Sequence, residues 1–97
     1  MKNDIPQAAA GVMGLHELPR HQVALVVGLQ AARDATEQVA VLRLAEIGFV
    51  PGEEVRVVAH GFPGGEPLAV RIGQTTFALR RNEAALVQVA LQTEVAA

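Results

Sequence analysis

Short stretches of alternating apolar residues, separated by glycine-containing turns, constrain the fold of this chain more than any other feature. The alternation has the two-residue period of a β-strand and recurs at residues 23–29, 55–60, 68–72, 77–79 and 87–91. Strands this short leave many unpaired edges in an open sheet, and closure into a small barrel hides those edges. The sequence therefore predicts an all-β domain, a small barrel of about five strands.

One segment departs from the two-residue period and has the features of a helix. Asp34 precedes Glu37 by three residues, a variant of the capping box that begins helices. Apolar residues follow at near-helical spacing until Gly48, at the position where a glycine commonly ends a helix. We therefore expect one short helix over residues 35–47.

Tight turns are expected at two further points. Pro51-Gly52 suits a type II turn, because proline fixes φ near −65° and glycine accepts the positive φ that follows. Gly73-Gln74 suits a two-residue hairpin turn, with glycine in the first, positive-φ position. Residues 82–84 fit a short capped turn or 3₁₀ segment before the last strand.

The length of the chain allows one domain and little more. With 97 residues, we expect an N-terminal tail over 1–14, the barrel domain over 15–92 and a C-terminal tail over 93–97. The first 14 residues lack the apolar stretch of a signal peptide, and no segment approaches the roughly 20 apolar residues of a membrane helix. We therefore expect a cytoplasmic protein without direct membrane insertion.

The side-chain types that are missing narrow the function. The sequence has no Ser, Cys, Tyr or Trp, and its only lysine is Lys2. Nucleophilic catalysis generally needs Ser, Cys or Lys beside a base, and thiolate metal sites need Cys. Glu53 and Glu54 occupy adjacent strand positions and so point to opposite faces, which rules them out as an acid–base pair. The sequence predicts a protein that is not an enzyme and requires no cofactor.

Four segments follow one another in the order of a known family. They are 43–57 (RLAEIGFVPGEEVRV), 64–70 (GGEPLAV), 77–84 (FALRRNEA) and 87–91 (VQVAL). Together they resemble the FeoA family (ferrous iron transport protein A) over about residues 15–91.

The resemblance implies both a fold and a role. Members of the family have an SH3-like barrel and accompany FeoB, a ferrous iron transporter in the membrane with a cytoplasmic G-domain. The resemblance thus implies an accessory or regulatory protein of bacterial ferrous iron uptake that binds FeoB or its G-domain. The alternative is a metal-responsive or general protein-interaction SH3-like module unrelated to FeoB. The chain departs from the family pattern at His21, where a glycine is common, and at Glu66, where Asp is common.

The three histidines are weak candidates for metal binding. His16 and His21 nearly match a zinc-protease helix, but a proline between them removes the one-turn spacing that this motif needs. His60 is expected on the outer face of its strand, opposite Val57 and Ala59. Exposed imidazoles bind Fe²⁺ or Zn²⁺ weakly, and we expect no other metal site.

The candidates for partner contacts are exposed charged residues and loop residues: Arg43, Glu46, Phe62, Pro63, Arg80 and Arg81. Phe62 lies in a glycine-rich loop and either anchors a partner or folds back onto the barrel. Phe49 and Phe77 are expected in the core. Beyond FeoB, we expect only weak self-association.

Two other binding functions fit the composition poorly. An SH3 domain that reads proline-rich peptides needs an aromatic-lined groove, and this chain has three Phe and no Tyr or Trp. A nucleic-acid-binding barrel needs basic residues interleaved with stacking aromatics, whereas eight Lys and Arg are outnumbered here by ten acidic residues. We expect no nucleic-acid partner.

Overall fold

A computed structural model describes residues 11–92, which form one curved antiparallel sheet and three helical segments. The strands are β1 (Val12–Gly14), β2 (Val23–Leu29), β3 (Glu54–Gly61), β4 (Gly65–Ile72), β5 (Thr75–Leu79) and β6 (Val87–Leu91). The helical segments are the 3₁₀ turn η1 (Leu15–Glu17), α2 (Ala35–Ile47) and the single turn α3 (Arg81–Ala84). The strand order is β1-β6-β2-β3-β4-β5. The mainly β, SH3-like fold with one short helix is confirmed, and the described residues form six strands where about five were expected.

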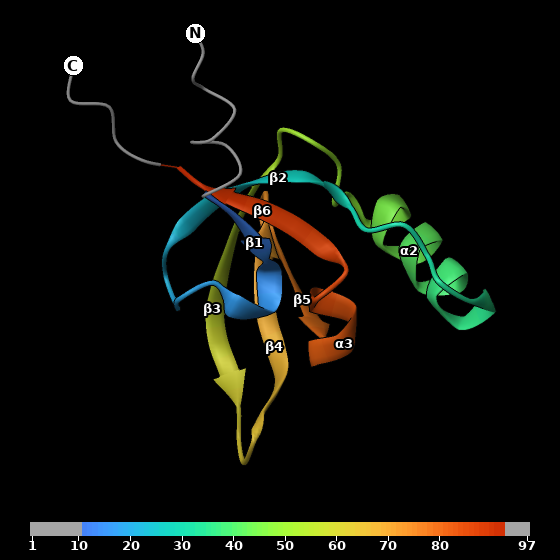
Figure 1. The fold of residues 1–97 in the computed structure, drawn as a ribbon. Helices are drawn as coiled ribbons and strands as arrows, with labels where there is room; N and C mark the ends of the chain where they lie inside the picture. Colours follow the sequence, from blue (N-terminus) through green and yellow to red (C-terminus); the bar gives the residue numbers. More distant parts are fainter. Residues whose placement is uncertain (1–10, 93–97) are drawn as a thin grey trace, which may run out of the picture.

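The sheet bends over itself and encloses the core. Strands β1, β6 and β2 cross over β3, β4 and β5 (Figure 1). The inward-facing apolar side chains of both halves form one cluster, with Leu15, Leu18, Leu44, Phe49, Ala84 and Leu86 added from outside the strands. No polar or charged residue in the described range is buried, so the side chains of the interior are all apolar.

Strand β1 lies in a segment that the sequence assigned to the N-terminal tail. Residues 12–14 pair with β6 in antiparallel register, from Val12 opposite Ala90 to Gly14 opposite Gln88. Residues 1–10 and 93–97 of the two expected tails lie outside the described range.

An extra residue interrupts β3 after Val57. Val57 pairs with Val70, but the next pair is Ala59 with Ala69, which leaves Val58 without a counterpart on β4. Such a bulge moves the residues that follow it to the other face of the sheet. The prediction that Val57 and Ala59 share a face was therefore wrong, because strict alternation cannot reveal an extra residue.

The bulge also changes the setting of His60. His60 pairs with Leu68, which is buried, so it lies on the core-facing side of the strand and not on the outer side. It is nevertheless exposed, one residue before the end of β3, where the β3–β4 hairpin extends beyond the rest of the sheet (Figure 1).

Helix α2 has the predicted bounds because both of its ends are closed by local hydrogen bonds. At the start, the Asp34 carboxylate accepts a bond of 2.8 Å from the Glu37 backbone N–H. At the end, Gly48 has a φ of 127°, and the Leu44 carbonyl accepts a bond from the Phe49 N–H at 3.1 Å. This 6→1 bond, with Gly48 donating to Ala45, is a Schellman closure.

The turn after the helix ties it to the sheet. The Glu53 N–H donates to the Val50 carbonyl at 3.1 Å, and Gly52 has a φ of 93°, as a type II turn requires. The Gly52 N–H also donates to the Val26 carbonyl on β2, and the Val26 N–H donates to the Glu53 carbonyl. Two backbone hydrogen bonds to Val26 thus attach the turn between α2 and β3 to strand β2.

Most of α2 stands in solvent beside the sheet (Figure 1). Leu44 is the only buried residue of the helix, with no exposed area, whereas Val39 is 67% and Leu42 is 55% exposed. None of the helices within residues 11–92 is long and apolar enough to span a membrane.

Replacing Leu44 with alanine should destabilise the fold far more than replacing Leu42 with alanine. We expect Leu44→Ala to lower the free energy of unfolding by about 2–5 kcal/mol, because it leaves a cavity in the core. Leu42→Ala removes an exposed side chain and should cost less than about 0.5 kcal/mol. Urea denaturation followed by far-ultraviolet circular dichroism measures both, and equal losses would contradict the role of Leu44 as the one fully buried residue that attaches α2 to the core.

Candidate functional site

A depression opens where α2 and α3 meet β4 and the end of β5. It is lined by charged and small residues: Arg43, Glu66, Pro67, Ala78, Arg80 and Glu83. Two of the six predicted contact residues, Arg43 and Arg80, therefore lie together in one hollow of the surface.

An ion pair joins the two helices across this depression. Nη1 of Arg43 lies 2.7 Å from Oε2 of Glu83, between residues 40 positions apart in the sequence. The Glu83 side chain is mostly covered, whereas that of Arg43 is half exposed. The pair is therefore a bridge between α2 and α3 that still presents a guanidinium to solvent.

Glu83 is held in its ionised form. Its partial burial would raise the pKa of the carboxyl, but the Arg80 backbone N–H and the Arg43 guanidinium both donate to it. These bonds outweigh the burial, so the pKa of Glu83 lies below its usual value. Glu83 is thus poised to orient arginines and not to exchange protons near neutral pH.

A second carboxylate links α3 to the β3–β4 hairpin. Oε2 of Glu66 accepts a bond of 2.8 Å from the Arg81 backbone N–H. The Arg81 side chain reaches the base of the hairpin, where a Cβ on Gly65 would lie 3.8 Å from its Nη2 atom. Arg81 therefore extends the charged surface from the helices toward the hairpin.

The tip of that hairpin projects from the molecule (Figure 1). Residues 62–64 form the turn between β3 and β4, and Phe62 is 95% exposed. The Phe62 ring therefore does not fold back onto the barrel, which was one of the two alternatives that the sequence left open. By contrast, Phe49 is fully buried and Phe77 packs partly buried against it, with ring centroids 6.4 Å apart.

Sequence reasoning found some of this surface and missed the rest. Arg43, Arg80 and Arg81 gather around α3, whereas Glu46 is an exposed residue of α2 that does not line the depression. The carboxylates Glu83 and Glu66 were not among the predicted contact residues. Glu83 could have been found from its position three residues after Arg80, since that spacing permits the observed helix-capping bond.

The three histidines do not lie together in the part of the chain that the structure describes. His16 lies in η1 with a buried Nδ1 that has no hydrogen-bond partner in the described structure, while His21 is exposed with a φ of 71°. No group of three or more His, Asp or Glu residues within 11–92 is placed to hold a metal ion. Weak metal binding at single imidazoles stays a prediction.

Comparison with known families decides the membership of the chain. The model of the FeoA domain matches residues 13–91, which is most of the sequence and nearly all of the described structure. The chain belongs to the FeoA family. The resemblance found in the sequence motifs is thereby confirmed.

Solved structures of the FeoA family share this fold. FeoA from Stenotrophomonas maltophilia, crystallised in complex with zinc, is 53% identical over 79% of this chain and 88% of its own, with a TM-score of 0.67. FeoA from Chlorobium tepidum is 30% identical over 84% of this chain and 71% of its own, with a TM-score of 0.68. The FeoA-like protein from Clostridium acetobutylicum shares the fold at 24% identity and a TM-score of 0.70, over 87% of this chain and 91% of its own. No curated protein sequence matches the chain.

Membership gives the coarse function. The FeoA family consists of SH3-like accessory proteins associated with ferrous iron transport and is not known as an enzyme family.

Neutralisation of Glu83 should remove a pH-dependent part of the stability. The folded pKa of Glu83 is depressed, so its contribution is present above the ordinary value of 4.5 and is lost as the pH falls through the folded pKa. At pH 7, Glu83→Gln should destabilise the fold by about 0.5–1 kcal/mol. Urea denaturation at pH 7 and pH 3 measures the free energy of unfolding of both proteins. The difference between them should be smaller at pH 3 than at pH 7. Glu46→Gln, at an exposed position, is the control, and a Glu83→Gln gap that does not vary with pH would refute the assignment.

Proposed function

We propose that this protein is a non-enzymatic accessory factor of bacterial ferrous iron uptake that binds the cytoplasmic G-domain of the FeoB transporter. Binding uses one continuous region, here called the arginine surface: Arg43, Arg80 and Arg81 with the hairpin tip of residues 62–64. A cytoplasmic location is part of this proposal.

The exposed ring of Phe62 is the observation that carries the proposal. A large apolar side chain that is 95% exposed gains nothing from the barrel, and it gains most when a partner covers it. Aromatic residues and arginines are the side chains enriched in protein interfaces and among their energetic hot spots. The combination fits a partner with an apolar pocket that is bordered by acidic residues.

The neighbouring charges favour recognition over chemistry. Glu83 accepts hydrogen bonds from the Arg43 guanidinium and the Arg80 backbone N–H, and Glu66 accepts one from the Arg81 backbone N–H. These bonds orient the Arg43 side chain and fix the backbone that carries Arg80 and Arg81. Oriented guanidiniums steer an acidic partner and set its register. No cofactor enters this proposal, and weak transition-metal binding by exposed imidazoles such as His21 and His60 is compatible with it.

Truncation within the arginine surface should weaken binding to the FeoB G-domain. We expect Phe62→Ala and Arg80→Ala each to raise the dissociation constant by about tenfold or more, because each removes a central contact. Isothermal titration calorimetry with the isolated G-domain, with and without a GTP analogue, measures the change.

Arg20→Ala is the matched control, because it removes an exposed arginine outside the arginine surface. Its affinity should equal that of the unchanged protein. Either an equal loss in all three variants or no binding of the unchanged protein at about 100 μM would refute the proposal.

A further inference from the structure

The strand order leaves β5 at one end of the sheet. Among residues 11–92 its only paired neighbour is β4, while β1 lies at the other end of the order. A strand in such a position presents backbone N–H and C=O groups to which a strand of another chain can pair. The register between β4 and β5 shows which groups these are.

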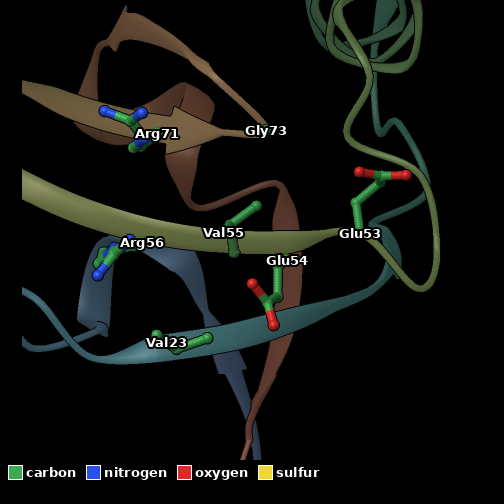
Figure 2. A pocket seen from close by; sticks show the side chains of 7 residues that line it. All are labelled: Val23, Glu53, Glu54, Val55, Arg56, Arg71 and Gly73. Carbon is green, nitrogen blue, oxygen red and sulfur yellow. The ribbon is translucent and has the colours of Figure 1, made fainter.

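The turn that leads into β5 sets this register. Figure 2 shows Gly73 just beyond Arg71, at the end of β4. Gly73 has a φ of 60°, as the first residue of a type II′ hairpin turn requires. Such a turn is closed by hydrogen bonding between its flanking residues, so Ile72 and Thr75 form a hydrogen-bonded pair.

The alternation of antiparallel pairing leaves Thr76 and Ala78 open on one side. Hydrogen-bonded and non-hydrogen-bonded pairs alternate along two antiparallel strands, so Phe77 also bonds to β4. Thr76 and Ala78 direct their N–H and C=O groups away from β4, and no other element of residues 11–92 bonds to these groups. Both residues are exposed. The edge thus offers two N–H and two C=O groups to a partner.

Strand β5 lacks the features that commonly protect an edge strand. Protected edges carry charged residues, a proline or a bulge. Residues 75–79 (TTFAL) contain no charge and no proline, and their five pairs with β4 run without a register shift. The opposite edge, β1, is only three residues long. β5 is therefore the edge better suited to pair with another strand.

The outer face of the sheet next to this edge carries arginines. Thr76 lies opposite Arg71, which in turn lies opposite Arg56 on β3. Arg80 follows at the end of β5 and lines the charged depression together with Ala78. The edge therefore runs directly into the arginine surface.

The core-facing side of the same edge is apolar. Phe77 is half-buried and packs against Phe49, so it is still partly accessible. Successive side chains of a strand point to opposite faces of the sheet. A strand added to β5 would therefore bring alternate side chains to Phe77 and to the arginines of the outer face.

Two of these arginines are available for a carboxylate of another molecule. Neither ion pair within residues 11–92 involves Arg71 or Arg80. Arg56 also repels Arg71, because like charges at opposite strand positions destabilise the pair. The two carboxylates of the depression, Glu66 and Glu83, already accept hydrogen bonds from this chain. Acidic side chains on the outer face of an added strand would offset the charge of Arg71 and Arg80.

We infer that β5 binds an extended segment of the FeoB G-domain as an additional strand of the sheet. The segment has apolar side chains toward Phe77 and acidic side chains toward Arg71 and Arg80. In this mode of recognition, backbone hydrogen bonds supply affinity and the alternate side chains supply specificity. The inference rests on the proposed function and specifies how the G-domain is held.

Amide hydrogen exchange of the full chain, followed by NMR, tests the added strand directly. In the free chain, the amides of Thr76 and Ala78 should exchange faster than that of Phe77, which is bonded to β4. A saturating amount of the G-domain should slow exchange at Thr76 and Ala78 by at least about tenfold, because their N–H groups become hydrogen-bonded. Exchange at Phe77 serves as the internal control.

A pair of variants at one position separates the backbone from the side chain. Thr76→Pro removes the outward N–H and places a ring at the edge, whereas Thr76→Val keeps the N–H and loses the same hydroxyl. A proline is tolerated on an edge strand where its nitrogen faces solvent. Thr76→Pro should raise the dissociation constant for the G-domain by about tenfold, and Thr76→Val by less than about twofold. Circular dichroism checks that both variants are folded.

The inference and the proposed function fail in different ways. A G-domain that binds without slowing exchange at Thr76 and Ala78 would overturn the inference and leave the proposed function standing. Equal affinities of Thr76→Pro, Thr76→Val and the unchanged chain would do the same. No binding of the G-domain at about 100 μM would overturn both.

Other occupants of the edge would be visible in the free chain. Slow exchange at Thr76 and Ala78 that becomes slower with rising chain concentration would identify a second copy on β5. Slow exchange at every concentration would identify a segment of the same chain. Either result would overturn the inference, because the edge would already be covered before the G-domain arrives.

Discussion

The closure of α2 onto the sheet is the constraint on which the rest of the structure depends. Gly48 turns the chain so that Leu44, inside the helix, and Phe49, just beyond it, both enter the core. The Leu44 carbonyl accepts the Phe49 N–H, and the next turn bonds to Val26 on β2. Since Leu44 is the only buried residue of α2, this short segment sets where the helix leaves the sheet. The same segment therefore sets where Arg43 meets Glu83 on α3.

Two charged surfaces follow from this arrangement, and they differ in how their charges are satisfied. Next to α3, the Arg43 guanidinium is paired with Glu83, whereas Glu66 holds only the backbone of Arg81. On the outer sheet face, Arg56 and Arg71 are placed together by strand register alone. Internally satisfied charges are oriented in advance, whereas unsatisfied ones gain most from a partner.

Local signals in the sequence were sufficient for much of the fold. Asp34 and Gly48 gave the exact bounds of α2, because capping and closure depend on neighbouring residues only. Long-range features were not accessible in the same way. Strand β1 exists because β6 offers it an edge, and the bulge at Val58 exists because β3 and β4 pair with one residue in excess. Alternation within one segment contains neither fact.

The candidate site also combines features that local sequence signals predict with features that depend on long-range contacts. Exposure of the loop with Phe62 could be proposed from its glycines, and the three arginines from their charge. The Arg43–Glu83 bridge spans 40 positions, and the Arg56–Arg71 pair needs the register between two strands. Such pairs appear only once the backbone is placed. The attachment of α2 through one fully buried leucine, with Ala40, Val41 and Ile47 partly buried against the core, also affects how the sequence can diverge. Substitutions at the exposed positions of that helix leave the core intact, so its outer surface is free to change along with whatever protein it meets, at little cost in stability.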